Sequence, residues 1–358
     1  MKVVYSLRHR HHHPRLELEA GALQEPFEHP GRAEMIRAAL AADATFDLVA
    51  PDEWGRGPIE AVHHAGLVEF LEHAWSEYQE VHGPTHDVVP DVFAMQGRRD
   101  GMGPGREPVA IGARLGWWCF ETTTPLTEGT YDAARASVDV ALTASAIVQS
   151  GDRVAYGLCR PPGHHASRSL YGGYCFFNNA AVVAQQLVSN GAKVTVLDVD
   201  YHHGNGTQQI FYDRDDVQFV SLHGDPRRAY PHLTGHRDEI GTGVGRGTTT
   251  NYPLPPLTED DAYVSTLAAA CAEVSAFRPD FLVVSLGLDT FVDYPISDLA
   301  LTADGFERSG ALVAELGVPM IVLQEGGYAT ADLGENARRW LLGADGRIRT
   351  GSVPASPD

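Results

Sequence analysis

The sequence predicts a single-domain α/β fold, with an open, mostly parallel sheet and helices on both of its faces. From about residue 153 onward, short runs of β-branched and other apolar residues alternate with longer segments of helical period. The apolar runs are continuous, which is typical of parallel strands that are buried on both faces. The chain has 358 residues, a length at which doubly wound folds commonly form one domain.

The strands and helices follow from these patterns. In the C-terminal part we expect strands over residues 153–159, 193–201, 217–223, 281–289 and 319–327. Helices are expected between them, including 176–190 and 302–316. The N-terminal part adds a strand over 2–6 and helices over 32–42, 59–79 and 129–148. Residues 82–116 carry Gly, Pro and charge without a period, and a loop of this length is usually functional or an interface element.

Composition excludes several classes of protein. The chain has 27 Lys and Arg against 47 Asp and Glu, a net charge of −20, so nucleic acid is not expected as a partner. This charge would attract a small cationic substrate, although it equally serves solubility. The four cysteines form no disulfide framework or zinc-finger spacing. No apolar run approaches the ~18 residues of a membrane span, and no leader pattern opens the sequence, so a cytoplasmic protein is expected.

Polar clusters fall where the expected strands end. Asp198 and Asp200 close one strand, Asp289 closes another, Glu325–Tyr328 close a third, and the segment RPPGHH follows a fourth. In open parallel sheets ligands bind outside the carboxyl ends of the strands, so we expect these clusters to converge on one crevice.

The residue types in this crevice predict a metal site. Asp200 and His202 are two residues apart, which on an extended chain places both side chains on one face. Together with Asp289 they offer three oxygen and nitrogen ligands and an open fourth position, the layout of a catalytic zinc site. The same set would accept Fe²⁺ or Co²⁺. Taken alone, the Asp-x-Asp-x-His-His stretch is also compatible with a turn that carries helix-capping acids.

Six motifs in order carry a family resemblance: RPPGHHA, GGYCFFNNAA, LDVDYHHGNGT, SLHGDP, SLGLDTF and EGGY. They resemble the histone deacetylase superfamily of zinc amidohydrolases, which has an arginase-like and deacetylase-like fold. The N-terminal stretch RLELEAGALQEPFEHPGRAEMI and the segment ISDLALT are similar to bacterial acetylpolyamine amidohydrolases. The similarity extends over nearly the whole chain.

The resemblance implies roles for the two histidine pairs. Asp200, His202 and Asp289 match the zinc ligands, and His203 is expected to be structural. His165 matches the general base and acid, and His164 its electrostatic partner. The remaining matches are Asp198 and Asn205 as hydrogen-bond acceptors of His164 and His165 respectively, and Tyr328 as the donor to the oxyanion.

Further matches concern the substrate and a second ion. Tyr174 and Tyr230 match the aromatic walls of the family's substrate tunnel, and Gly173 matches the residue whose carbonyl meets the scissile amide N–H. A structural potassium ion is implied at the following residues, the last four through their backbone: Asp198, Asp200, His202, Ser221 and Leu222.

The resemblance also implies a homodimer, in which the insertion at 82–116 lies at the dimer interface and narrows the active-site mouth. Glu17 matches an acid that meets the distal ammonium group of the substrate. Gly112 stands where a second acid is expected from the insertion, with Glu107 several residues before it. The histidine-rich stretch RHRHHHP (residues 8–14) is expected to form a loop that faces solvent.

Three functions are therefore compatible with the sequence. The one favoured is a zinc-dependent amidohydrolase that deacetylates small acetylated amines, with acetylpolyamines or another small biosynthetic intermediate as substrates. The second is a protein lysine deacetylase with the same chemistry, which the long insertion disfavours. The third is a catalytically silent binding module, which the complete set of ligands, the histidine pair and Tyr328 disfavour.

Overall fold

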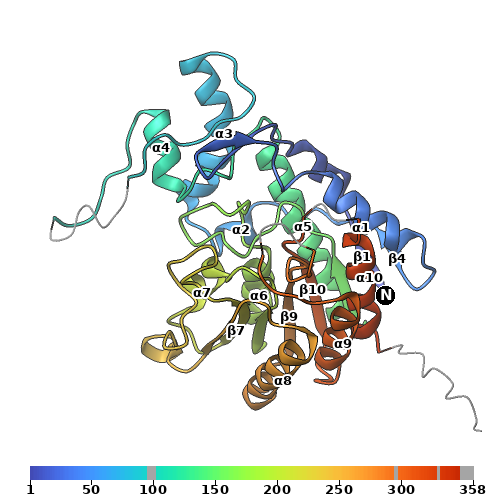
Figure 1. The fold of residues 1–358 in the computed structure, drawn as a ribbon. Helices are drawn as coiled ribbons and strands as arrows, with labels where there is room; N and C mark the ends of the chain where they lie inside the picture. The colour runs from blue at the N-terminus through green and yellow to red at the C-terminus, as the bar shows by residue number, and fades with distance from the viewer. Residues whose placement is uncertain (95–101, 294–296, 329–330, 347–358) are drawn as a thin grey trace, which may run out of the picture.

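The structure is a computed structural model that describes residues 1–94, 102–293, 297–328 and 331–346. Its centre is an eight-stranded sheet in the order β4-β1-β5-β10-β9-β6-β7-β8, in which every neighbouring pair is parallel (Figure 1). The strands are β1 (Lys2–Val4), β4 (Asp47–Val49), β5 (Val154–Gly157), β6 (Val194–Asp198), β7 (Val217–Gly224), β8 (Thr249–Leu254), β9 (Phe281–Leu286) and β10 (Met320–Gln324). The expected fold class is confirmed.

The central strands are buried on both faces because their side chains alternate between two hydrophobic clusters. Val196 of β6 and Val283 of β9 belong to one cluster. The next residues along these strands, Leu197 and Val284, belong to the other. This alternation follows from the two-residue repeat of a strand, and it explains why the strand sequences are continuously apolar rather than alternating.

Helices cover both faces of the sheet (Figure 1). Helices α5 and α6 pack into one hydrophobic cluster, whereas α1, α8, α9 and α10 pack into the other. The helices are α1 (Gly31–Ala41), α2 (Gly57–Glu60), α3 (Ala65–His82), α4 (Ile111–Trp118), α5 (Thr130–Gln149), α6 (Asn179–Ser189), α7 (Asn205–Phe211), α8 (Asp260–Phe277), α9 (Ala303–Ala314) and α10 (Leu333–Ala344), with 3₁₀ turns at Leu7–His11 and Gly243–Gly245. None of the described helices combines the length and apolar character that a membrane crossing requires.

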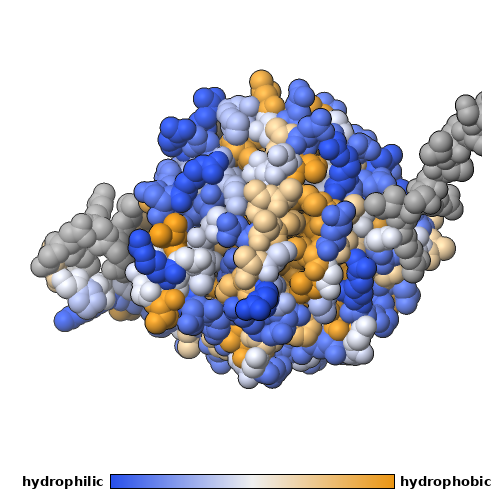
Figure 2. Space-filling view, turned by 90° about the horizontal axis from the view of Figure 1, so that it is seen from below, coloured by the Kyte–Doolittle hydropathy of each residue, from blue (hydrophilic) through white to orange (hydrophobic). Residues whose placement is uncertain are grey.

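Helix α8 was not delimited by the sequence pattern, and its composition explains why. Leu267 and Val274 face the core, but the exposed positions include Ala268, Ala269 and Ala272 rather than charged residues. The contrast between the two faces, on which helical periodicity depends, is therefore weak. Viewed from below, the molecule accordingly shows hydrophobic residues gathered in the middle of that face, with hydrophilic residues around them (Figure 2).

Two further elements lie outside the eight-stranded sheet. Strands β2 (Glu17–Glu19) and β3 (Ala22–Gln24) form a hairpin whose turn has positive φ at Ala20 and Gly21. Helix α4 begins inside the segment expected to have no element of its own, because Ile111, Leu115 and Trp118 bury one helical face. Of the insertion expected over 82–116, residues 95–101 lie outside the described residues.

The prediction that the histidine-rich N-terminal stretch faces solvent is wrong for two of its four histidines. His9 and His12 are each 2% exposed. The reason is the buried guanidinium of Arg160, whose Nη1 donates to the carbonyl oxygens of His9 (2.5 Å) and His12 (2.9 Å) and draws this segment inward. The four cysteines are free and buried, as expected without a disulfide framework.

Candidate active site

The candidate active site forms where the neighbouring strands β10, β9 and β6 end. Asp198 is the last residue of β6, Asp289 follows β9, and Glu325 directly follows β10. The loops after these strands bond to one another: the Gly326 N–H donates to Asp200 Oδ2 (2.7 Å), and the Tyr201 N–H to Asp289 Oδ1 (2.9 Å). The structure thus brings together the clusters that the sequence placed at separate strand ends.

Asp200, His202 and Asp289 form a buried group whose ligand atoms all lie within 4.8 Å of one another. His202 Nδ1 lies 2.8 Å from Asp289 Oδ2 and 3.3 Å from Asp200 Oδ1. Burial and the neighbouring Asp200 charge raise the pKa of Asp289 to about 6. Two carboxylates this close in a dry environment repel unless a cation lies between them. The donor set and its charge therefore fit a divalent metal ion with mixed oxygen and nitrogen ligands.

The histidine pair lies beside this group, with ring centroids 4.1 Å apart. His164 Nδ1 is 3.0 Å from Asp198 Oδ2, and His165 Nδ1 is 2.7 Å from Asn205 Oδ1. Burial would lower the pKa of His164, but the charges of Asp198 and Asp200 outweigh it and raise the pKa to about 10. Burial and the adjacent His164 instead lower the pKa of His165 well below its usual value. Two histidines with opposite shifts can serve different roles in proton transfer.

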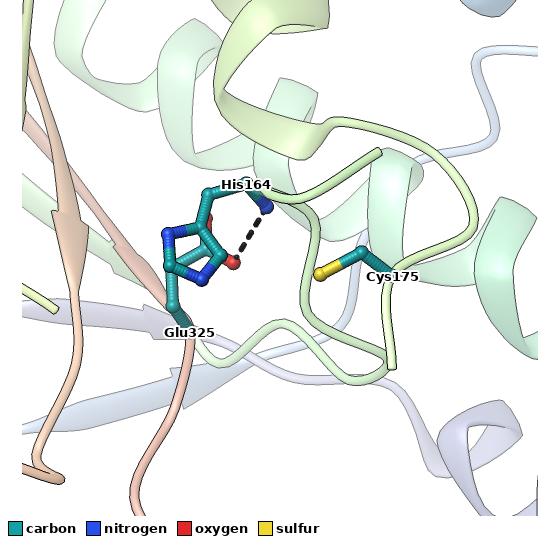
Figure 3. Close-up of side chains that lie close together, drawn as sticks. All are labelled: His164, Cys175 and Glu325. Carbon is teal, nitrogen blue, oxygen red and sulfur yellow. Dashed lines mark hydrogen bonds between the residues drawn. The ribbon is translucent and has the colours of Figure 1, made fainter. Parts of the chain in front are cut away.

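A second buried cluster joins His164, Cys175 and Glu325 (Figure 3). Glu325 Oε2 accepts the backbone N–H groups of Gly163 (2.6 Å) and His164 (3.1 Å), and the second of these bonds is the dashed line in Figure 3. Burial raises the pKa of the Cys175 thiol, which donates to the Gly173 carbonyl (3.2 Å). A protonated thiol is a poor metal ligand. This cluster therefore supports the histidine pair, a role that sequence reasoning did not assign to Glu325.

Arg32 of α1 is a site residue that sequence reasoning missed. Its Nη1 donates to Glu28 Oε1 (2.8 Å), and its Nη2 to the carbonyl of Glu325 (2.9 Å). Arg160 binds the same carboxylate of Glu28 through Nε (2.8 Å) and Nη2 (2.9 Å). Burial would raise the pKa of Glu28, but Arg160 and Arg32 lower it to about 2. In sequence, an arginine in a helix is read as a surface residue, so no signal marked this buried network.

Candidate catalytic and substrate-binding residues line one cavity of about 420 Å³. The Tyr174 and Tyr328 rings lie 5.6 Å apart, and the His165 and Tyr230 rings 5.0 Å apart. Among the residues that line the cavity are His165, Gly173, Tyr174, His202, Tyr230 and Tyr328. A larger cavity of about 700 Å³ lies beside His11, His13 and His86, but none of the candidate catalytic residues lines it.

The acidic residues near this cavity differ in exposure. Glu17, the acid that sequence analysis assigned to the substrate, is fully buried, and its Oε1 accepts Gln24 Nε2 (3.1 Å). Glu19 at the hairpin tip and Glu121 both line the cavity. Glu107 of the insertion accepts Trp118 Nε1 (2.9 Å) and an arginine side chain instead.

The residues expected to hold potassium lie at and just after the end of β6 and within the neighbouring strand β7. Asp198 of β6 is in register with Ser221 of β7, and both are buried. Asp198 Oδ1 also accepts the Asp200 N–H at 3.2 Å. His203, expected to be structural, is 1% exposed and hydrogen-bonds through both ring nitrogens, to Thr234 and Gln208.

Comparison with known proteins yields close relatives over nearly the whole chain. A model of the histone deacetylase domain matches residues 26–343. The chain is 44% identical to acetylpolyamine amidohydrolase 1 of Pseudomonas aeruginosa, over 98% of this chain and 100% of that protein. It is 42% identical to the acetylpolyamine amidohydrolase of Mycoplana ramosa, over 97% and 100%. The crystal structure of the acetylpolyamine aminohydrolase from Burkholderia pseudomallei matches with a TM-score of 0.89 and 38% identity, over 96% and 98%.

Proposed function

Because the chain belongs to the histone deacetylase family, and is thus a deacetylase, we propose that it hydrolyses acetylpolyamines with the aid of a zinc ion. Relatives that carry the name acetylpolyamine amidohydrolase match nearly full length. The observation that carries the proposal is that His165, His202 and Tyr328 line one cavity together with the carboxylates of Glu19 and Glu121. Reactive groups and negative charge at one cavity suit a substrate with an acetamide at one end and an ammonium group at the other.

Asp200, His202 and Asp289 would hold the metal ion, for which Fe²⁺ and Co²⁺ are the alternatives to zinc. When bound, such an ion acidifies the attacking water and polarises the acetyl carbonyl. The backbone N–H of His202 donates to Asp200 Oδ1 (2.8 Å), so one carboxylate oxygen is fixed before any ion arrives. Fixed ligands of this kind lower the cost of reorganisation during binding.

His165 is the proposed base and acid. Its low pKa keeps the ring neutral, and the Asn205 oxygen 2.7 Å from Nδ1 keeps the proton there. The lone pair of Nε2 is then free to accept the proton of the attacking water, and Nε2 later donates a proton to the leaving amine. Asp198 keeps His164 in the charged form beside it, which stabilises negative charge as the tetrahedral state forms.

Tyr328 is the proposed donor to the oxyanion. It is 5% exposed and lines the cavity, so its O–H acts in a place from which water is largely excluded. A hydrogen bond there is stronger than in water. Tyr174 and Tyr230 would flank the acyl end of the chain, and the Gly173 carbonyl would accept the scissile amide N–H.

Glu19 is the carboxylate best suited to meet the distal ammonium group directly. It lies at the exposed hairpin tip, lines the cavity, and makes no hydrogen bond or ion pair with any described residue. Glu17, two residues before it, is fully buried, and burial raises the pKa of its carboxyl, so it is less suited to a direct contact with the substrate. The structural potassium site, the homodimer with residues 82–116 at its interface, and a cytoplasmic location are further parts of this proposal.

The test is kcat/KM of the zinc-loaded and cobalt-loaded enzyme on acetylputrescine, acetylcadaverine and acetylspermidine, compared with an acetyl-lysine peptide. We expect a preference for the acetylpolyamines of about 100-fold or more, as a charged contact of roughly 3 kcal/mol would give. Equal values, or a preference for the peptide, would instead support the protein deacetylase that shares this chemistry.

A further inference from the structure

The wall of the cavity contains a tight turn with an unusual backbone. Gly172 and Cys175 exchange two backbone hydrogen bonds, of 3.0 and 3.1 Å, around Gly173 and Tyr174. Both central residues have positive φ, 59° at Gly173 and 64° at Tyr174, as a type I′ turn requires. Glycine adopts this conformation freely, whereas a tyrosine does so at a cost. The turn must therefore be held by its surroundings.

Hydrogen bonds to Glu121 and Thr124 hold the turn in place. The bonds across the turn leave the central N–H groups unused. The Gly173 N–H donates to Glu121 Oε1 (3.0 Å), and the Tyr174 N–H donates to the Thr124 hydroxyl oxygen (2.7 Å). The Thr124 hydroxyl in turn donates to Glu121 Oε1. Both central N–H groups of the turn therefore depend, directly or through one hydroxyl, on a single carboxylate.

The Glu121 carboxylate is fully used by these and two further bonds. Its Oε2 accepts the backbone N–H and the hydroxyl of Thr123. With the donors from Gly173 and Thr124, four hydrogen bonds occupy the roughly four lone-pair positions that a carboxylate offers. Glu121 lines the cavity like Glu19, but unlike Glu19 it has no acceptor position left for an ammonium group.

The turn carries groups that the reaction depends on. A Cβ atom at Gly173 would lie only 2.4 Å from His165 Cδ2, so the backbone packs directly on that ring. The Tyr174 ring packs edge-on against the Tyr328 ring, with centroids 5.6 Å apart. A shift of this turn would therefore disturb both sides of the reacting acetamide, and small misplacements of reacting groups are costly in rate.

We propose that Glu121 is a positioning residue, which holds the Gly173–Tyr174 turn against His165 and Tyr328 through its own bonds and through Thr124. It acts on every acetamide that enters the cavity, cationic or neutral, and not by binding the ammonium group. The inference rests on the proposed function for the identity of the reaction, and it assigns substrate charge recognition to Glu19 and turn geometry to Glu121.

The test compares two substrates, acetylputrescine and a neutral acetyl-lysine coumarin amide with a blocked α-amine. We expect Glu121→Gln, which replaces one acceptor oxygen by a donor, to lower kcat/KM about tenfold to 100-fold on both substrates alike. The matched variant Glu19→Gln should lower kcat/KM on acetylputrescine more than on the neutral substrate. A Glu121→Gln effect confined to acetylputrescine would make Glu121 an ammonium contact and overturn the proposal.

A second pair of variants separates loss of the hydrogen bond from loss of folding. Thr124→Val removes the hydroxyl at nearly constant volume, whereas Thr124→Ser keeps it. We expect Thr124→Val to lower kcat on both substrates and Thr124→Ser to restore it, with melting temperatures of the two variants within a few degrees. Equal kcat in the two Thr124 variants would contradict the relay from Glu121 to the Tyr174 N–H.

Hydrogen exchange separates this inference from the proposed function, since it needs no substrate. In the metal-loaded protein, the peptide containing Gly173 and Tyr174 should exchange faster in Glu121→Gln and Thr124→Val than in wild type and Thr124→Ser. Unchanged exchange in both variants would overturn the positioning role. Wild-type inactivity on both substrates would overturn the proposed function and leave the exchange result to decide this one.

Discussion

The guanidinium carbon of Arg32 lies 4.2 Å from the centroid of the Tyr328 ring, and the same side chain binds the backbone that leads to this tyrosine. Arg32 donates to the carbonyls of Glu325 and Gly327. One buried cation thus fixes both the ring of Tyr328 and the segment before it, and Glu28 balances its charge.

This arrangement predicts that Arg32→Lys lowers kcat about tenfold or more, because an ammonium group cannot replace the planar fork that reaches three partners. Metal content should stay at the wild-type level. Arg37→Lys is the matched control, since Arg37 lies on the same helix and binds Glu34 at the surface. Steady-state kinetics and metal analysis of both variants check this, and an unchanged kcat in Arg32→Lys would contradict it.

For Tyr328→Phe we predict a loss of kcat of about 100-fold to 1,000-fold, which is the usual effect of removing one oxyanion donor. The ring and its contact with Arg32 remain, so melting temperature and metal content should match wild type. Single-turnover kinetics measure the chemical step directly. A near-normal rate would show that another group stabilises the oxyanion.

Asp289→Ala should abolish stoichiometric metal binding, because it removes one of three buried donors and halves the carboxylate charge of the group. Affinity of a three-ligand site falls steeply when one ligand is lost. Metal content after dialysis is the measurement, and Asp304→Ala, an exposed acid in the first turn of α9, is the control. Retention of one equivalent of metal by Asp289→Ala would reject the ligand assignment.

Buried His63 predicts acid sensitivity of the fold. Its Nδ1–H donates to the Ser167 carbonyl (2.9 Å), and Nε2 accepts the Asn178 N–H (2.9 Å). Burial lowers its pKa from 6.5 to about 4. The unfolded chain therefore takes up a proton at this residue first as pH falls. The contribution of His63 to stability is constant above about 6.5 and decreases between 6.5 and 4, by up to ~1.4 kcal/mol per pH unit.

Urea unfolding of the metal-free protein between pH 7.5 and 4 checks whether stability decreases with acid as predicted. In His63→Gln the free energy of unfolding should be lower at pH 7.5 but should fall less steeply with acid than in wild type. An identical pH slope for the two proteins would remove His63 from the explanation, leaving other buried histidines such as His12 as the cause.

Much of this site was predictable because the carboxyl ends of parallel strands lie at the same edge of the sheet. The positions of Asp198, Asp289 and Glu325 relative to the apolar runs were enough to place them together. The hydrogen bonds from His164 to Asp198 and from His165 to Asn205 also join residues that family resemblance had paired.

The remaining features depend on contacts that no local pattern encodes. The burial of His9 and His12 is set by Arg160, about 150 residues away in the chain. Arg32 and Glu121 were not identified because one resembles a surface arginine and the other an ordinary loop acid. Their importance comes from carbonyl and N–H groups on distant turns. Similarly, the hairpin tip that exposes Glu19 and buries Glu17 is visible only in three dimensions.

The most direct test of the central claim is the ratio of kcat/KM for acetylputrescine and N-pentylacetamide, in which a methyl group replaces the ammonium at equal chain length. An acetylpolyamine deacetylase should prefer acetylputrescine by about 100-fold, or roughly 3 kcal/mol of transition-state binding, and the preference should shrink in Glu19→Gln. A ratio near one would show that the cavity recognises the acetamide alone, and would contradict acetylpolyamines as the substrates of this enzyme.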